Sequence, residues 1–256
     1  MSDRQRAARI ASPIRGAKPE PVANSMLAAL PRRLYQRLRR GLEPVKLEFG
    51  AILYEPGDTI RDVYFPNNSI VSLLTLVEGR LALEVGLVGR EGMVGIPVAL
   101  GIDVTPVRAL VQGAGTAMRM NAARFRKELA KSLPLQTEIY RYTNALMAQI
   151  TQTAACNRFH LVEARLARWL LMTRDRMQSA QIHLTHEFLS HMLGVRRVGV
   201  TEAASALQRQ KLIEYSRGNI RILDNHGLEA ASCPCYEIVR DMYDGAPREQ
   251  PWNHDG

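Results

Sequence analysis

The first stretch with a clear hydrophobic pattern spans residues 25–42 and predicts short amphipathic helical structure. Its apolar positions recur every three or four residues, which is the spacing that places side chains on one face of a helix. They are Met26, Leu27, Leu30, Leu34 and Leu38. Because a proline inside a helix removes a hydrogen bond and clashes with the preceding turn, we expect a break at Pro31.

From residue 45 to residue 120 the pattern changes to short runs rich in valine, isoleucine and leucine. Turn-forming segments separate these runs at residues 49–50, 55–58, 66–68, 78–80, 88–90 and 113–115. Glycine and asparagine supply the positive φ that such turns need, and Pro56 is suited to the position before Gly57. Many short strands with regular turns predict an antiparallel barrel or roll.

Residues 134–160 predict one long helix with a single apolar stripe. The stripe advances by four, three, four and four residues and consists of Leu135, Ile139, Tyr142, Leu146 and Ile150. The stripe either packs on the chain's own roll or meets the same helix of a second copy. We favour the second interpretation, a two-fold dimerisation seam, because a helix this long with one seam suits a partner helix. A further amphipathic helix follows over residues 161–177.

Residues 184–223 predict a winged helix. A first helix is bounded by Thr185 as a capping residue and Gly194 after its last apolar turn. A second helix over residues 196–210 follows after a connector of about three residues, and such a pair forms a helix-turn-helix. Two alternating apolar segments joined by a turn at residues 216–219 then predict a β-hairpin, which completes the winged helix.

The start of the second helix carries the functional chemistry. Arg196 and Arg197 lie there, and a helix in the major groove presents its first residues to base edges, where a guanidinium fork bonds to guanine O6 and N7. Arg217 and Arg221 of the hairpin are candidates for phosphate contacts. Two solvated arginines are the simpler alternative. The helix dipole disfavours cations at that end, so we favour insertion into the groove.

Charge and composition agree with a nucleic-acid partner. The 256 residues carry a net charge of +9, and the surplus is concentrated at residues 1–44, with ten basic and three acidic residues, and at residues 165–223, with ten and four. The first block is polar and without periodicity, so we expect a flexible basic tail over residues 1–25, whereas the second block coincides with the predicted winged helix. With 46% hydrophobic residues, three cysteines, no apolar run of about 18 residues and no secretory signal, we expect a cytoplasmic protein that does not enter a membrane.

The order of roll, long helix and winged helix, with residues 50–58 and 184–223, resembles the Crp/Fnr superfamily of bacterial transcription regulators over roughly residues 26–230. The resemblance implies an α+β fold with a jelly-roll-like, cyclic-nucleotide-binding-like sensor domain at residues 26–133, a dimerisation helix at 134–160 and a DNA-binding domain at 161–230. Residues 231–256 are then a tail. It also implies a homodimer on a palindromic operator in double-stranded DNA, and contact with RNA polymerase.

The family's base-reading arginine corresponds to Arg197, and the preceding, phosphate-facing position to Arg196. Where the catabolite activator of this family has an acidic residue and a second arginine, this chain has Val198 and Glu202, so its operator should differ. Val198 suits a thymine methyl group, and Glu202 accepts from a cytosine amino group. Thr185 matches a phosphate-contacting position. We add Thr201 to the predicted DNA-binding set.

The effector is not evident from the sequence. Family members that bind cyclic nucleotides have a glutamate for the ribose and an arginine for the cyclic phosphate, whereas the matching cassette here contains Gly95, Ile96, Pro97 and Arg108. The side chain of Ile96 cannot accept a hydrogen bond. We therefore expect that cyclic AMP is not the effector.

The cysteines and histidines predict no cofactor, since an oxygen-sensing iron–sulfur cluster needs four thiolates and this chain has three. Cys156 lies in the long helix, whereas Cys233 and Cys235 follow the hairpin, so the sequence supports no four-ligand cluster or zinc site within one chain. A thiol switch at the latter pair is an alternative to idle buried thiols. His186 and His191 are five residues apart, not the four of a zinc protease helix.

The sequence therefore predicts a dimeric, sequence-specific transcription regulator without enzymatic activity, because no nucleophile and base, phosphate loop or metal set is evident. The alternative is an effector-binding roll that acts through protein contacts and carries a vestigial DNA-binding domain. Binding to genomic DNA fragments distinguishes the two hypotheses.

Overall fold

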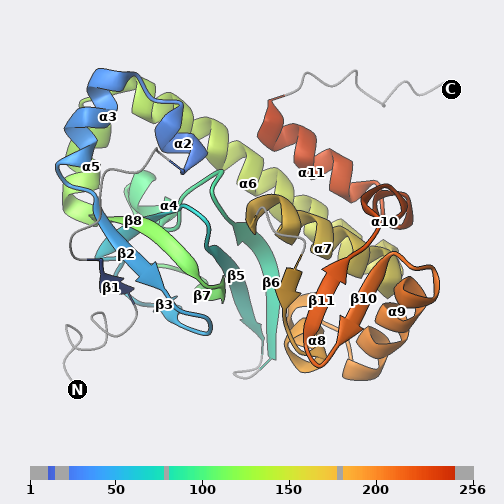
Figure 1. The fold of residues 1–256 in the computed structure, drawn as a ribbon. Coiled ribbons are helices and arrows are strands. Elements are labelled where there is room, and N and C mark those ends of the chain that lie inside the picture. The colour runs from blue at the N-terminus through green and yellow to red at the C-terminus, as the bar shows by residue number, and fades with distance from the viewer. Residues whose placement is uncertain (1–10, 15–22, 78–80, 178–180, 246–256) are drawn as a thin grey trace, which may run out of the picture.

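The computed structural model describes residues 11–14, 23–77, 81–177 and 181–245, and a long helix runs past both of its main parts (Figure 1). The N-terminal part contains two antiparallel sheets, and the C-terminal part contains a helix-turn-helix with a small third sheet. The predicted α+β class, with an antiparallel roll before a winged helix-turn-helix, is confirmed.

The roll is built from two four-stranded sheets in the orders β1-β2-β8-β4 and β3-β7-β5-β6. Its strands are β1 (Ala11–Pro13), β2 (Glu43–Leu47), β3 (Ile52–Tyr54), β4 (Asp62–Pro66), β5 (Ile70–Val77), β6 (Leu81–Val88), β7 (Arg108–Gly113) and β8 (Gly115–Asn121), and a short helix α4 (Ile96–Ala99) lies between β6 and β7. The turn after β3 is closed by a hydrogen bond from the amide of Asp58 to the carbonyl of Glu55. Gly57 has a φ of +88° there, as that turn requires.

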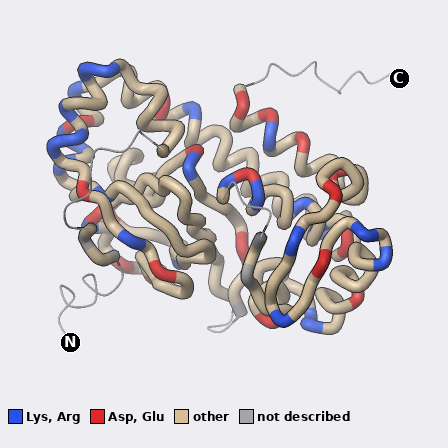
Figure 2. The backbone as a smooth tube through the Cα atoms, in the orientation of Figure 1, with Lys and Arg blue, Asp and Glu red and all other residues tan. Residues whose placement is uncertain are grey.

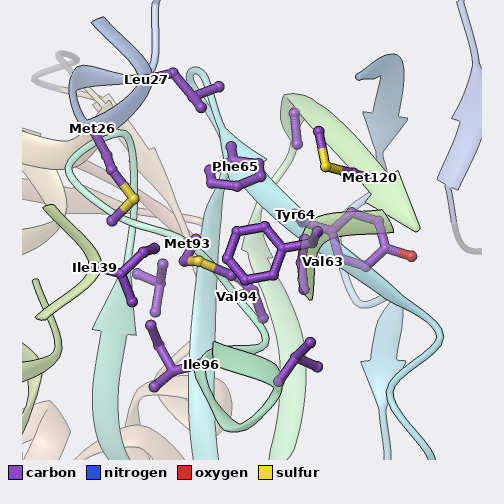
Figure 3. Packing of buried hydrophobic residues seen from close by; sticks show 14 of the residues in the cluster. Met26, Leu27, Val63, Tyr64, Phe65, Met93, Val94, Ile96, Met120 and Ile139 are labelled. Atoms are coloured by element: carbon purple, nitrogen blue, oxygen red, sulfur yellow. The ribbon is translucent and has the colours of Figure 1, made fainter. Parts of the chain in front are cut away.

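The interior of the roll is a continuous apolar core. Phe65 of β4 contacts Phe125 edge to face, with ring centroids 6.1 Å apart, and both rings are almost fully buried. Figure 3 shows Phe65 in one cluster with Met26, Met93 and Ile139, which come from four different segments of the chain. The apolar periodicities of residues 25–42, 45–120 and 134–150 thus converge on this core.

The N-terminal segment is fastened to the roll at two places. Asn24 caps α2 (Ser25–Ala28) by accepting from the amide of Leu27, and its buried side-chain amide donates to the carbonyls of Pro66 and Gly92. Helix α3 (Arg32–Arg39) begins after Pro31, so the predicted break is confirmed. β1 (Ala11–Pro13) pairs with β2, and the expected flexible tail is therefore wrong for these three residues; residues 1–10 and 15–22 lie outside the described residues.

Helix α5 (Ala122–Ala130) leads into α6 (Leu133–Phe159), the predicted long helix. The apolar stripe of α6 packs against its own chain, and the prediction that this stripe forms the dimerisation seam is wrong. Its members are buried in the core of the roll, with Ile150 partly so: Leu135, Ile139, Tyr142, Leu146 and Ile150. The spacing correctly indicated a buried face, but periodicity does not say which partner covers it. Within the described ranges, no helix has the apolar length that a membrane crossing requires, α6 included.

The C-terminal part has a second core that also covers the outer face of β5 and β6. It contains α7 (Val162–Met177), β9 (Gln181–His183), α8 (His186–Leu193), α9 (Arg197–Arg209), β10 (Ile213–Ser216), β11 (Asn219–Ile222) and α10 (Asn225–Ala231). The apolar residues of these elements form one cluster with Ile70, Leu74 and Leu87 of the roll. The helix-turn-helix is therefore packed against the sensor domain.

A further helix, α11 (Cys235–Asp244), follows α10 and lies along α6 and α7 (Figure 1). The expected tail over residues 231–256 is wrong for this segment, because Tyr236 and Val239 are buried in the second core. Tyr243 contacts Tyr142 of α6, with ring centroids 6.2 Å apart. The chain thus folds back over its long helix after the wing.

Polar side chains connect the roll to α7 at two buried points. Glu84 of β6 accepts a hydrogen bond of 2.9 Å from the indole nitrogen of Trp169, and Arg176 forms an ion pair of 2.8 Å with Glu91. At the rim, Phe49 of the roll contacts Phe188 of α8, with ring centroids 5.6 Å apart. The position of the DNA-binding domain is therefore set by specific contacts as well as by apolar packing.

Candidate nucleic-acid interface

Helices α8 and α9 form the predicted helix-turn-helix. The hydroxyl of Thr185 accepts from the amide of Phe188 at the start of α8, and Gly194 ends this helix with a φ of +60°. Helix α9 begins at Arg197 and ends at Arg209, one residue inside the predicted bounds at each end. Its small inner residues, Val200, Ala203 and Ala204, are buried, so the two helices pack closely.

The first two turns of α9 and the residue before it carry five of the predicted DNA-binding residues, and all of them are exposed. They are Arg196, Arg197, Val198, Thr201 and Glu202. Val198 leaves 59% of its surface accessible, although it is apolar. No acidic side chain among the described residues lies within 4.0 Å of Arg196 or Arg197. Two uncompensated guanidinium groups thus stand at the start of the helix, as a groove-reading role requires.

Behind Arg197, the side chains of His186, Thr201 and Tyr215 connect α8, α9 and the wing. The sequence did not predict this role for His186 or Tyr215, and it predicted Thr201 only as a DNA contact. His186 lies 3.0 Å from the hydroxyl of Thr201 and stacks edge to face on Tyr215, with ring centroids 4.5 Å apart. The hydroxyl of Tyr215 donates to the carbonyl of Leu184. The hydroxyl of Thr201 also donates to the carbonyl of Arg197, so its structural contacts hold the first turn of α9 in place.

The electrostatics of this group reflect its burial and the nearby arginine. Desolvation, followed by the positive charge of Arg197, lowers the pKa of His186. Desolvation also raises the pKa of Tyr215 to about 12, against an opposing effect of Arg197. Both rings therefore favour their neutral forms near neutral pH, and no added positive charge competes with Arg197 at the surface.

The wing is the predicted hairpin, with Arg217 and Gly218 as its two turn residues. Their φ angles are +49° and +82°, and an arginine in this left-handed region costs about 1 kcal/mol relative to glycine. Arg221 is paired with Glu214, its partner across the hairpin, at 2.6 Å. Two phosphate contacts were predicted in the wing. Arg217 lies at the tip and is unpaired among the described residues, whereas the charge of Arg221 is compensated by Glu214.

Together these residues form a basic surface on one side of the domain. Thr185, Arg197 and Arg217 line the same hollow of about 330 Å³ between α8, α9 and the wing. Figure 2 shows lysine and arginine positions on α9 and at the tip of the β10–β11 hairpin. The DNA-binding residues predicted from the sequence therefore lie together. Among them, Arg221 forms an ion pair with Glu214 of the neighbouring strand.

The residues that correspond, by the family resemblance, to a nucleotide-binding site lie in the roll. Their side chains contact other residues of the roll. Gly95 precedes α4 with a φ of +104°, and the side chain of Ile96 belongs to the core. Pro97 stands in the first turn of α4. The guanidinium of Arg108 forms a hydrogen-bonded ion pair of 2.9 Å with Glu55, which compensates its charge.

A group of possible metal ligands lies at the other end of α6, where the sequence analysis expected none. Cys156 of α6 and His160, which follows this helix, meet Cys233 and Cys235, and the four ligand atoms lie within 4.8 Å of one another. The expectation that these cysteines lie apart is wrong, because α11 folds back along α6. The spacings C-x-x-x-H and C-x-C were the available signal in the sequence.

Comparison with known proteins gives a match for the C-terminal part and for the fold. Residues 164–231 match the Crp-like helix-turn-helix domain. No curated protein matches the chain. FixK2 from Bradyrhizobium japonicum has a TM-score of 0.65 at 12% identity, over 75% of this chain and 98% of that one.

Two further solved structures are similar to the chain. A transcriptional regulator of the CRP family from Thermus thermophilus has a TM-score of 0.62 at 19% identity, over 73% of this chain and 95% of that one. The c-di-GMP-responsive global regulator CLP from Xanthomonas campestris also has a TM-score of 0.62, at 16% identity, over 76% of this chain and 100% of that one. The chain thus has the fold of these solved transcription regulators, and its residues 164–231 match a Crp-like helix-turn-helix domain.

Proposed function

We propose that this protein is a sequence-specific DNA-binding transcription regulator that acts as a homodimer on a palindromic operator. The observation that carries the proposal is the exposed outer face of α9, which begins with two arginines that have no acidic partner among the described residues. Two exposed arginines at the start of a helix do not stabilise the fold, because the helix dipole disfavours positive charge at that end.

The roles of the individual residues follow from their chemistry. Arg197 reads a guanine through a bidentate contact, Glu202 accepts from a cytosine amino group, and Val198 contacts a thymine methyl group. Thr185 and Arg196 contact phosphates, and Arg217 at the wing tip adds a third phosphate contact. Arg221 can contribute only if DNA displaces Glu214 from it. The bound dimer then contacts RNA polymerase, as the family resemblance implies.

The test is selection of bound fragments from the genome of origin, followed by measurement of affinity for the selected site. We expect Arg197→Ala to weaken binding to this site by about 1–3 kcal/mol, or roughly 5- to 150-fold, because the bidentate contact to guanine is lost. Weak binding to unrelated DNA should persist, because phosphate contacts supply it. Fluorescence anisotropy with labelled duplexes at a fixed salt concentration measures both affinities.

Arg209→Ala is the matched control, since Arg209 is an exposed arginine at the far end of the same helix. It should leave the preference for the selected site unchanged. An equal loss on selected and unrelated DNA would assign Arg197 to a phosphate instead. If no native fragment is bound by the wild-type protein at low salt, the alternative of a vestigial DNA-binding domain is the correct one.

The homodimer is proposed from the face of α6 that the described residues leave uncovered. Tyr140 and Met147 are 56% and 63% exposed and lie two turns apart, and residues of small or uncharged type continue the same face. They are Leu133, Thr137, Asn144, Thr151 and Ala154. This exposed stripe, and not the buried one predicted from the sequence, suits a parallel contact with the α6 of a second copy.

We expect Met147→Glu to weaken dimerisation at least 10-fold, because two-fold symmetry brings two unpaired carboxylates into the apolar seam. Sedimentation equilibrium measures the dissociation constant. Leu223→Glu makes the same chemical change at another exposed apolar position, away from α6, and should leave the dimer intact. A Met147→Glu variant that dimerises like the wild type would place the interface elsewhere.

We also propose that cyclic AMP is not the effector. Two contacts support this: the guanidinium of Arg108 is held by Glu55, and the side chain of Ile96 is directed into the core, where the glutamate of nucleotide-binding relatives would hold the ribose. A cyclic phosphate would have to displace Glu55 before it could reach Arg108. Isothermal titration calorimetry with cyclic AMP should therefore show no binding in the micromolar range.

A further inference from the structure

Two short sequence patterns supply four side chains at one place. Cys156 lies in the last turn of α6, and His160 is the residue that follows this helix, with its amide hydrogen-bonded to the carbonyl of Cys156 at 3.1 Å. Cys233 and Cys235 flank Pro234 at the start of α11. The return of α11 along α6 brings the two pairs together, although 77 residues separate Cys156 from Cys233.

The distances within this group match those around a single tetrahedral ion. The sulfurs of Cys156 and Cys233 are 3.4 Å apart, and the sulfur of Cys235 is 3.4 Å from Nδ1 of His160. Zinc–sulfur bonds of ~2.3 Å and zinc–nitrogen bonds of ~2.1 Å place tetrahedral ligand atoms ~3.5–3.8 Å from one another. All four atoms lie within 4.8 Å of each other, so small side-chain rotations suffice to close the tetrahedron.

The surroundings suit a group with negative charge. All three cysteines are buried, and the side-chain amide of Gln152 donates to the sulfur of Cys235 at 3.1 Å. A deprotonated thiol is the form that binds a metal.

Two buried arginines stand beside the thiols with donors to spare. Nε of Arg165, and Nε and one terminal nitrogen of Arg168, are buried without a hydrogen-bond partner in the described structure. Both guanidinium groups interact electrostatically with Cys156. Three thiolates, one neutral imidazole and a divalent ion carry a net charge of −1, which the two positively charged arginines offset.

We propose that Cys156, His160, Cys233 and Cys235 form a structural zinc site that fastens α11 to the end of α6. Three thiolates and an imidazole are a ligand set typical of structural zinc, and four protein ligands leave no open position for catalysis. An iron–sulfur cluster distributes its ligands around several metal ions, which spreads them farther apart than a single ion does. The compactness of this group therefore favours one ion.

The site has a structural consequence for the regulator. Helix α11 carries Tyr236 and Tyr243, whose hydroxyls contact Arg174 of α7 and Gln149 of α6. An ion at the start of α11 would hold this helix over the junction between the roll and the DNA-binding domain. Because a metal bound only by the folded chain stabilises it, zinc removal should lower the melting temperature of the whole protein.

The test is the metal content of the full-length protein, purified without chelators and measured by mass spectrometry together with protein concentration. We expect about one zinc ion per chain. Replacement of zinc by Co²⁺ should give the visible absorption of tetrahedral cobalt and a near-ultraviolet thiolate band. Protein that contains no metal, with three titratable thiols or a disulfide between Cys156 and Cys233, would overturn the proposal.

Variants identify the ligands. Cys235→Ser should reduce the thiolate-to-cobalt band by about a third, since one of three sulfurs is lost, and His160→Ala should weaken zinc affinity while this band persists. Gln152→Ala, which removes only the hydrogen bond to Cys235, should weaken zinc binding about 10- to 100-fold. His226→Ala removes an exposed histidine of α10 and should leave metal content unchanged. If the ligand variants fail to fold, the cobalt spectrum of the wild-type protein still reports tetrahedral thiolate ligation or its absence.

Discussion

Arg176→Ala should destabilise the protein by about 3–5 kcal/mol, because it leaves the carboxylate of Glu91 at a largely buried position without its partner. The guanidinium of Arg176 donates to Glu91 at 2.8 Å, to the side chain of Gln149 at 2.9 Å and to the carbonyl of Met172 at 3.1 Å. It also lies 5.2 Å from the ring centroid of Tyr243. Urea unfolding followed by circular dichroism measures the loss.

Arg240→Ala is the matched control for this prediction. Arg240 also lies over a tyrosine ring and near acidic side chains, but its side chain is 39% exposed, whereas that of Arg176 is 7% exposed. Solvent screens its interactions, so we expect a loss below about 1 kcal/mol. Equal losses for the two variants would mean that burial of the ion pair does not determine its contribution.

The location of Arg176 connects this prediction to function. Its partners come from the roll, α6, α7 and α11, which are the elements that meet between the sensor and the DNA-binding domain. A double variant, Arg176→Met with Glu91→Gln, removes both charges and should recover part of the stability. If DNA affinity in this double variant changes while stability is restored, the ion pair contributes to communication between the domains.

Local signals explain why the helix-turn-helix was predictable. Thr185 and Gly194 mark the ends of α8, and the small residues of α9 mark its inner face, all within 20 residues of sequence. The wing was equally local, since Arg217 and Gly218 form the two-residue turn between two alternating segments. Each of these elements is determined by neighbours in the chain, which is the information a single sequence carries best.

Contacts between distant segments were not predictable in the same way. The stripe of α6 that contains Ile139 and Leu146 was correctly identified as buried, but the pattern is the same whether a roll or a second helix covers it. The contact between Cys156 and Cys233 depends on the path of α11. The sequence predicted only a tail for that segment. The compensation of Arg221 by Glu214 required the hairpin register.

A buried carboxyl group at the same junction leads to the second large prediction. Glu84 of β6 receives hydrogen bonds from the hydroxyl of Ser72 at 2.7 Å and from the indole of Trp169 at 2.9 Å. Desolvation raises the pKa of Glu84 from its ordinary 4.5 to about 7, although Ser72, Trp169, Arg168 and Arg176 all act in the opposite direction. The group is therefore partly protonated near neutral pH.

The hydroxyl of Ser72 also connects Glu84 to a second buried side chain, Gln112. The hydroxyl of Ser72 lies within hydrogen-bond distance of both Glu84 and the side-chain oxygen of Gln112, yet it has a single proton. When Glu84 is protonated, its own proton goes to Ser72, and the proton of Ser72 goes to Gln112. Both contacts of the Ser72 hydroxyl are then satisfied.

A carboxyl group with a raised pKa in the folded state stabilises the fold at low pH, because the folded chain binds more protons there than the unfolded chain. For Glu84 this contribution is present below about pH 4.5 and is lost as the pH rises through about 7. Glu84→Gln keeps a neutral acceptor for Trp169 at every pH. Relative to this variant, the wild-type protein should therefore lose about 2 kcal/mol between about pH 5.5 and about pH 8.

Urea unfolding of both proteins at the two pH values measures this difference, since ionisations elsewhere in the chain cancel in the comparison. Glu214→Gln, which removes an exposed carboxylate from the wing, should show the same pH dependence as the wild type. Parallel pH profiles for wild type and Glu84→Gln would mean that Glu84 is ionised throughout this range. Divergent profiles would show that proton uptake at Glu84 of β6, which contacts Trp169 of α7, stabilises the folded protein.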